Sequence, residues 1–132
     1  MDVRVYSAPL RIPSRTPITD PVRQFVQMEP GRVIRVTILF PWGHAGLTGL
    51  QIWKEGAQIA PLPDGAWLIG NDVLYDFPFN IFLDTDPPGL MLVGYNEDDY
   101  FDHTIYVSFH LMPKAALISA LDALAMLGIG RT

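Results

Sequence analysis

The sequence predicts an all-β protein, an antiparallel sandwich of two sheets. Several segments alternate apolar and polar residues with the two-residue period of a half-buried strand. Clusters of glycine, proline and aspartate separate these segments at intervals near the 8–12 residues typical of sandwiches and barrels. Between residues 22 and 112 no stretch has the length and period of a helix, so a parallel sheet with crossover helices is not expected.

Eight predicted strands follow one another along this region. In chain order they span residues 22–28, 32–40, 50–54, 57–62, 66–70, 73–83, 90–96 and 103–111. The second is expected to bury Ile34, Val36, Ile38 and Phe40, and the last is expected to bury Ile105, Val107, Phe109 and Leu111. Pro78 marks the strand over 73–83 as an edge or a bend, because proline cannot donate to the ladder. Eight strands suit a jelly roll, although sequence alone does not reveal their order.

Residues 1–21 form a segment of different composition. Four prolines lie within residues 8–21, so we expect an extended arm outside a sandwich of residues 22–112. Residues 3–7 alternate and could pair with a sheet edge in this subunit or in another. Residues 1–35 hold six arginines and three acids, a net charge of +3, whereas residues 36–132 carry −8. A basic segment joined to an acidic body is typical of an interaction arm.

Residues 113–132 are predicted to form a short C-terminal helix and tail. Pro113 suits the first helical position, and the alanine and leucine residues that follow are strong helix formers. Leu117, Leu121 and Leu124 recur at helical spacing, but the helix is apolar nearly all round. Such a helix is buried or lies at an interface. It could cover an open sheet or pack against copies of itself, and we favour the second.

An acid loop precedes the last strand and spans residues 96–102. Its carboxylate and amide oxygens are of the kind that calcium binds, but their spacing does not match the EF-hand loop. The alternatives are a solvated hairpin loop, or a docking surface for the arginines of a neighbouring subunit's arm. The candidate interface residues are therefore Arg4, Arg11 and Arg15 of the arm and Asp98, Asp99 and Asp102 of the loop.

The sequence offers little for catalysis. It contains no cysteine, no Gly-x-Ser-x-Gly elbow, no His-Glu-x-x-His pair and no phosphate-binding loop. His103 follows Asp102, but adjacent residues of a strand point to opposite faces. We therefore expect a protein that is not an enzyme and that needs neither a cofactor nor a catalytic metal.

Trp53 is the remaining candidate. It is out of phase with Leu50 and Ile52, so it is expected to face outward. An outward tryptophan serves as an interface anchor or as a platform for a sugar ring, and the first use is the more common. Nucleic acid is not an expected partner, because the isoelectric point is about 4.9. No run of 18 apolar residues predicts a membrane span, and no signal peptide is apparent, which indicates synthesis in the cytoplasm.

A basic arm, an acidic sandwich and an apolar C-terminal helix together resemble, in outline, the small β-sandwich or jelly-roll structural proteins of virus and phage particles. In such proteins arms from one subunit lie on the next. The resemblance implies a non-enzymatic assembly protein that forms a homo-oligomer or docks on a larger particle such as a virion. The alternative is a β-sandwich module that binds a carbohydrate or a calcium-dependent ligand through residues 41–49 and 95–103.

Overall fold

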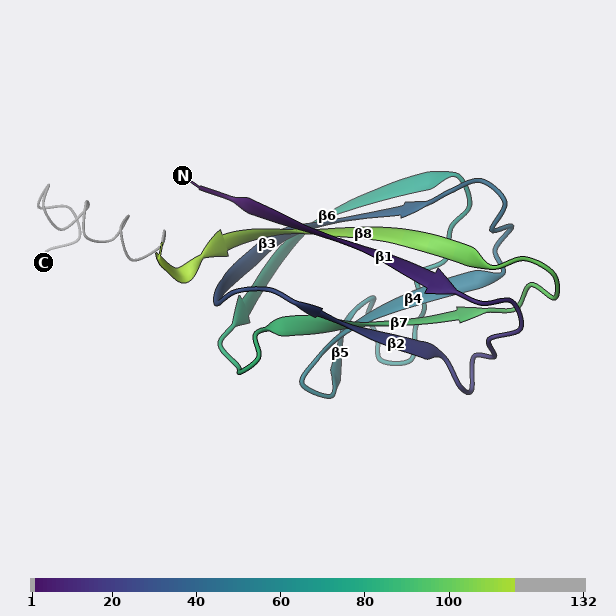
Figure 1. Cartoon of the computed structure of the whole chain (residues 1–132), viewed down its shortest axis with the longest axis horizontal. Helices are drawn as coiled ribbons and strands as arrows, with labels where there is room; N and C mark the ends of the chain where they lie inside the picture. Colours follow the sequence, from purple (N-terminus) through teal and green to yellow (C-terminus); the bar gives the residue numbers. More distant parts are fainter. Residues whose placement is uncertain (1, 116–132) are drawn as a thin grey trace, which may run out of the picture.

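A computed structural model describes residues 2–115 and consists of two layered antiparallel sheets (Figure 1). Its strands are β1 (Arg4–Ile12), β2 (Val22–Gln27), β3 (Gly31–Phe40), β4 (Thr48–Lys54), β5 (Ala57–Ala60), β6 (Val73–Leu83), β7 (Gly89–Asn96) and β8 (His103–Pro113). Pro113, predicted to be the first helical residue, is instead the last residue of β8. The remainder of the predicted helix that carries Leu117, Leu121 and Leu124 lies outside the described residues.

The strand order is that of a jelly roll. Sheet A has the order β1-β8-β3-β6 and sheet B the order β2-β7-β4-β5. The chain changes sheet at every connection except the β4–β5 hairpin, so β1 pairs with β8, β2 with β7, β3 with β6 and β4 with β5. This is the arrangement of one long hairpin rolled up into two Greek keys. Sequence alternation therefore correctly predicted an eight-stranded antiparallel sandwich.

The core fills the space between the two sheets, which lie one above the other in Figure 1. Both inner faces contribute residues that are almost completely buried: Leu10, Ile12, Val33, Val36, Ile38, Phe40, Leu50, Ile52, Leu83, Leu90, Leu92, Ile105, Val107, Phe109 and Leu111. The four residues predicted to be buried in the last strand are among them. Pro78 lies in β6, which is an edge strand of sheet A as its proline predicted.

Three predictions about individual segments were wrong. Ile34 is only partly buried and Val33 is inward instead, because the register of β3 shifts between Val33 and Arg35. A bulge of this kind adds one residue and reverses the alternation beyond it. Residues 66–70 do not form a strand, and only an isolated bridge joins Leu68 to Leu50. The count of eight was correct because β1 takes the place of that segment.

The predicted arm is the third error, because nine of its 21 residues form a strand of the sandwich. Residues 4–12 form β1, the edge strand of sheet A, and bury Ala8, Leu10 and Ile12 in the core of their own chain. Pro9 is tolerated because β1 is an edge strand and Pro9 faces outward. The sandwich therefore begins at residue 4 and not at residue 22.

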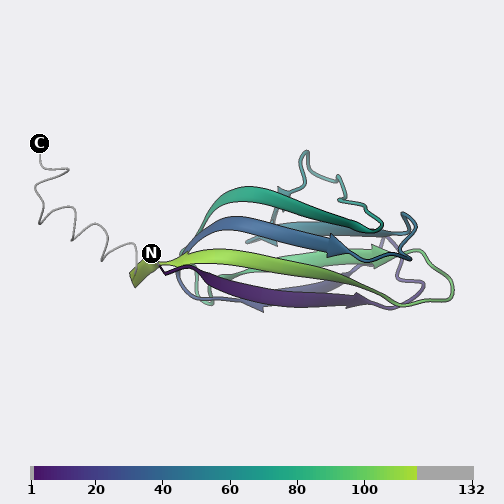
Figure 2. The same cartoon turned by 90° about the horizontal axis from the view of Figure 1, so that it is seen from above.

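Three connections gather at one end of the sandwich, which we call the loop end: residues 13–21, 41–47 and 97–102. The first residues of β1 and the last residues of β8 lie at the opposite end (Figures 1 and 2). Because β1, β3 and β7 all end at the loop end, segments far apart in the sequence meet there.

Candidate functional site

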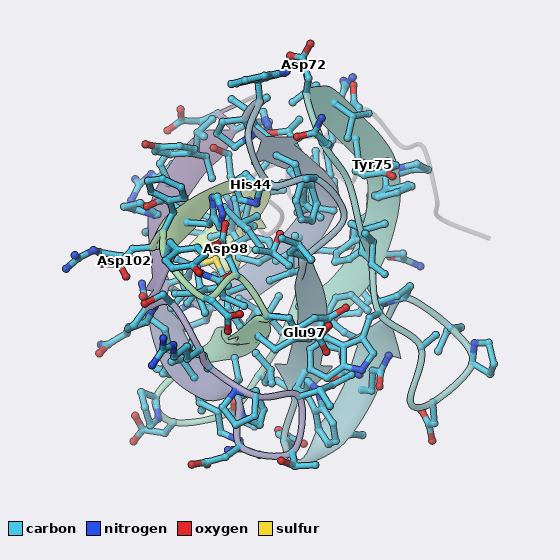
Figure 3. The ribbon with its side chains drawn as sticks, turned by 90° about the vertical axis from the view of Figure 1, so that its right-hand side faces the viewer. His44, Asp72, Tyr75, Glu97, Asp98 and Asp102 are labelled. Carbon is cyan, nitrogen blue, oxygen red and sulfur yellow. The ribbon has the colours of Figure 1, made fainter. Side chains whose placement is uncertain are left out.

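The acid loop lies at the loop end, where the acidic residues labelled in Figure 3 surround the ends of the strands. Arg11 donates to Asp102 at 2.5 Å, and the backbone amide of Ser14 donates to the other carboxylate oxygen at 2.8 Å. The Arg15 amide donates to the carbonyl of Asp98 at 2.9 Å, and its guanidinium donates to the carbonyl of Asp99 at 3.2 Å. The predicted contact between arginines and acids therefore forms within one chain, not between subunits.

Arg4, the third candidate arginine, lies at the other end of β1. Its guanidinium donates to both carboxylate oxygens of Glu29, at 2.8 and 3.0 Å, and the Tyr6 hydroxyl donates to the same carboxylate at 2.7 Å. Arg4 is therefore also paired within its own chain. All three arginines help to hold β1 and its flanking residues in place.

The side-chain oxygens of three residues of the acid loop, Asn96, Asp98 and Asp102, accept hydrogen bonds from the protein. One carboxylate oxygen of Asp98 accepts from the amides of Tyr100 and Phe101, at 2.9 and 3.2 Å. The Asn96 side-chain oxygen accepts from the Asp98 amide, and its nitrogen donates to the carbonyls of Ile12 and Phe101. Calcium would have to displace these hydrogen bonds. Within residues 2–115, no three metal-ligating side chains are grouped so that they could hold a metal ion.

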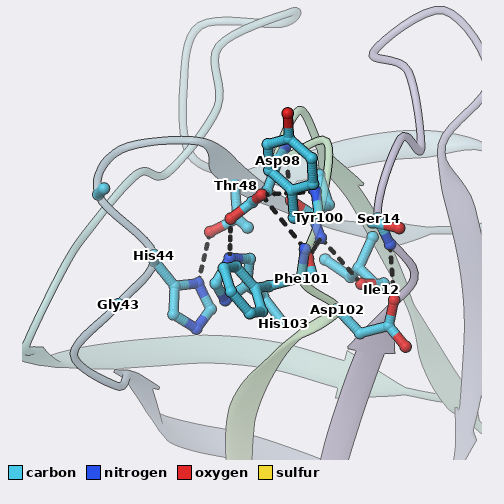
Figure 4. A network of polar contacts seen from close by, with 12 residues as sticks. Ile12, Ser14, Gly43, His44, Thr48, Asp98, Tyr100, Phe101, Asp102 and His103 are labelled. Carbon is cyan, nitrogen blue, oxygen red and sulfur yellow. Dashed lines mark hydrogen bonds and ion pairs between the residues drawn. The ribbon is translucent and has the colours of Figure 1, made fainter.

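A buried polar network ties the acid loop to residues 41–47 (Figure 4). The second oxygen of Asp98 lies 2.9 Å from His103 Nε2. The His103 ring packs on the His44 ring with 4.5 Å between their centroids, and His44 Nδ1 lies 2.6 Å from Thr48 Oγ1. We call Asp98, His103, His44 and Thr48 the loop-end network. Sequence adjacency suggested Asp102 as the neighbour of His103, but the partner in space is Asp98.

Burial lowers the pKa of His44, whereas hydrogen bonds lower the pKa of Asp98. His44 is 1% exposed, and its burial lowers its pKa to about 4, with the adjacent His103 acting in the same direction and a backbone hydrogen bond to Thr104 opposing. His44 is therefore neutral at pH 7. Hydrogen bonds from the Tyr100 amide and from His103 lower the pKa of Asp98, so this carboxylate is charged.

The network resembles a proton relay in composition, but its geometry suits a structural role. Thr48 is fully buried and His44 nearly so, which leaves a substrate no approach to either side chain. General acid–base catalysis requires contact between the catalytic group and the proton that it moves. The network instead joins two loops that carry exposed aromatic residues, Trp42 on one and Tyr100 and Phe101 on the other.

A groove of about 530 Å³ lies on the outer face of sheet B. Its floor consists of Phe25 of β2, Met91 and Val93 of β7 and Trp53 of β4. Arg23, Glu55 and Asp86 contribute charged groups to its lining. Trp53 is therefore outward, as the alternation predicted, and it is half-buried by its neighbours in this groove.

Sequence reasoning missed the other residues of the groove. Phe25 occupies the outward phase of β2 together with Arg23 and Gln27, whereas Val26 is inward. An aromatic residue in the polar phase of a strand was the available signal. Nothing in the sequence indicated that Phe25 and Trp53 would lie on the same face, because β2 and β4 come together only through β7.

The outer face of sheet A carries an exposed apolar row across all four strands. The register places Pro9 of β1 beside Tyr106 of β8, Tyr106 beside Leu39 of β3, and Leu39 beside Leu74 of β6. All four side chains are exposed, Leu74 by 62%. Contiguous apolar surface of this kind marks an interaction site more often than scattered single residues do.

Comparison with known proteins identified no relative: no protein-family pattern and no curated protein matches this sequence. In the part of the chain that the structure describes, no helix combines the length and the hydropathy that crossing a bilayer requires. The two outer faces and the loop end are therefore the candidate functional surfaces of this chain.

Proposed function

We propose that this chain is a non-enzymatic assembly protein, a subunit that associates with copies of itself through the outer face of sheet A. A larger particle such as a virion is one setting for it. The observation that carries the proposal is the apolar row of Pro9, Tyr106, Leu39 and Leu74. The arm that sequence analysis expected to join subunits has no such role in the proposal, because it forms β1.

The pattern on this face favours a symmetric contact. Next to the apolar row lies a polar band, in which Ser7, Ser108, Thr37 and Asp76 are neighbours by register. Beyond it the face is mixed: His110 and Arg35 lie between Val5 and Pro78 in the next row, and Arg32 lies between Met112 and Phe82 in the row after that. If a second copy packs face to face about a two-fold axis parallel to the strands, the apolar row of one copy meets the apolar row of the other. An isologous interface requires this self-complementarity.

The size of the face is sufficient for such a contact. Four strands of about nine residues, at the usual strand and residue spacings, cover roughly 600 Å² in projection. Side chains add to the accessible area, which brings it near the roughly 800 Å² per partner of a standard interface. The Arg35–Asp76 ion pair is satisfied within the chain, so packing this face need not leave these two charges unpaired.

The test is the mass of the native chain by light scattering over a range of concentrations, compared with that of Leu74→Asp. Leu62→Asp is the matched control: it makes the same change at a leucine that is 71% exposed but lies in the β5–β6 connection. Burying the exposed part of Leu74 is worth about 1–2 kcal/mol per subunit. A two-fold contact doubles this loss, so dimerisation should weaken roughly 30- to 700-fold.

The expected result is an oligomer for the native chain and for Leu62→Asp, and a monomer for Leu74→Asp at the same concentration. Circular dichroism checks that each variant keeps its β-sheet. A native chain that is monomeric at high concentration would rule out the proposal. An oligomer that Leu74→Asp leaves unchanged would place the contact elsewhere on the molecule.

A further inference from the structure

We propose that the groove on the outer face of sheet B binds a disaccharide of gluco-configured pyranoses, whose ring hydroxyls are all equatorial. This site is independent of the assembly proposal, because sheets A and B present their outer faces on opposite sides of the sandwich. Three features of the groove suit such a ligand: its apolar floor, the contacts that hold its aromatic rings and three charged groups in its lining.

The floor is an apolar row across three neighbouring strands. Met91 of β7 lies between Phe25 of β2 and Trp53 of β4, because both of these residues pair with it in register. Two strand spacings separate the outer members, a distance of about 10 Å. This is the length of a disaccharide, so one pyranose ring can lie near Phe25 and the other near Trp53. The volume of about 530 Å³ is within the usual range for small-molecule sites.

Both aromatic rings are held in place before any ligand binds. The Phe25 ring lies against the backbone of Gly89, where an added Cβ would stand only 2.5 Å from Phe25 Cζ. The Trp53 indole N–H donates to the Gln51 side-chain oxygen at 2.9 Å, and the Gln51 amide nitrogen donates to the Ala66 carbonyl at 3.0 Å. The Trp53 N–H is therefore already satisfied, which leaves the carbon framework of the indole for contact with a ligand.

The lining provides the hydrogen-bonding groups that sugar hydroxyls need. Arg23 carries donors, and Glu55 and Asp86 carry acceptors. Among residues 2–115, none of these three side chains forms an ion pair or a side-chain hydrogen bond. Glu55 and Gly56 both adopt positive φ, at 51° and 78°, as the central residues of the β4–β5 hairpin turn. This tight turn sets Glu55 beside the groove, and Gly56 adds no side chain to obstruct it.

These features select the configuration of the sugar. In a gluco-configured ring the hydroxyls project from the edge, and only C–H groups lie on the two faces. Those C–H groups suit the electron-rich face of an aromatic ring. The edge hydroxyls can then reach charged groups in the lining. An axial hydroxyl would instead bring a polar oxygen onto Phe25, Met91 or Trp53, where it would lose water without gaining a partner.

The experiment is calorimetric titration of the full-length protein with cellobiose and with chitobiose. Both are β-1,4-linked disaccharides of gluco-configured rings. The expected result is saturable binding of at least one of them, weakened about tenfold or more in Trp53→Ala. Trp42→Ala is the matched control, because Trp42 is 80% exposed in the β3–β4 connection and lies outside the groove. This control should bind as the native chain does.

Two further variants test the lining without touching the floor. Glu55→Gln and Asp86→Asn keep the shape of each side chain and remove its charge, and each should weaken binding several-fold because charged acceptors form the stronger hydrogen bonds. Absence of binding by both disaccharides at 10 millimolar, roughly the weakest affinity of interest, would overturn the proposal. Binding of unchanged affinity in Trp53→Ala would also overturn it.

A third outcome would identify a different occupant. If Trp53→Ala lowers the light-scattering mass of the protein while neither disaccharide binds, the groove is a contact between copies of the chain and the sugar proposal is wrong. Leu74→Asp should leave sugar binding intact. Failure of the sheet A contact and failure of the sugar site are therefore distinguishable.

Discussion

The buried His44 side chain should make the stability of this protein depend on pH between about 6.5 and 4. In the folded chain its pKa is lowered to about 4, first by burial and then by the adjacent His103. In the unfolded chain the imidazole returns to its ordinary pKa of about 6.5. Within this interval the unfolded state binds a proton that the folded state does not bind, so acidification favours unfolding.

The magnitude follows from the width of the interval. The difference between the folded and unfolded pKa values of His44 corresponds to a loss of about 3 kcal/mol in the free energy of unfolding. Within the interval this free energy falls by at most roughly 1.4 kcal/mol per pH unit. This loss is absent at pH 7 and complete near pH 4. Asp98 and Asp102 also have lowered pKa values, and their stabilising contribution is lost as pH falls below the ordinary carboxyl range. Their effect therefore begins largely where that of His44 ends.

The assay is urea unfolding, followed by tryptophan fluorescence at several pH values from 7 to 4.5 and at one protein concentration. His44→Asn removes the titrating ring while retaining a polar atom near the position of Nδ1. His110→Asn is the matched control, because His110 lies on the outer face of β8. The native chain and the control should lose most of the 3 kcal/mol, and His44→Asn should lose much less. If His44→Asn has the same slope as the native chain, the assigned role of His44 is wrong.

Three further predictions concern the fold. Asp98→Asn should lower the melting temperature more than Asp99→Asn. Asp98 accepts hydrogen bonds from two amides and contacts His103, whereas the Asp99 side chain is 70% exposed. Equal melting temperatures of the two variants would contradict this. Phe109→Ala should lower the free energy of unfolding, measured in urea, by about 3–5 kcal/mol because the Phe109 ring is fully buried. A decrease of less than about 1 kcal/mol would show that the core repacks to fill the cavity. Gly94→Ala should lower the free energy of unfolding by about 1–3 kcal/mol, because the new Cβ would stand 2.6 Å from Ile12 Cδ1. It should also increase the rate of hydrogen exchange in β1, and an unchanged rate would contradict the prediction.

In residues 4–12 two local signals conflict, because the apolar alternation predicts a strand and the nearby prolines predict an extended arm. Ala8, Leu10 and Ile12 alternate with the two-residue period of a strand, but the four prolines of residues 8–21 favour an extended arm. Proline removes a backbone donor, and that loss matters only where a neighbouring strand would accept from it. Whether a neighbour is present depends on the sheet order. The same segment would be a poor central strand and is an adequate edge strand.

The loop-end network could not be predicted for a related reason. His44 belongs to the β3–β4 connection, Asp98 to the acid loop 54 residues later, and His103 to the start of β8. Their residue types are as common in solvated loops as in buried clusters. The sequence does indicate that arginines near the N-terminus suit the acids of residues 98–102. It does not indicate whether the two groups meet within one chain or between two. The pairing of β1 with β8 places them together in one molecule.

What the sequence by itself determined is the set of strands from residue 22 onward, with the exception of residues 66–70, and the inward face of most of them. Alternation, turn residues and the edge proline are local signals that need no knowledge of neighbours. Only the tertiary structure decided the strand order, the place of residues 4–12, the loop-end network and the two outer faces. These depend on pairings between residues far apart in the chain, such as Phe25 with Met91 and Met91 with Trp53. The two-residue period of a strand indicates which of its residues lie on the same face. The sheet order determines which residues of other strands lie beside them on that face.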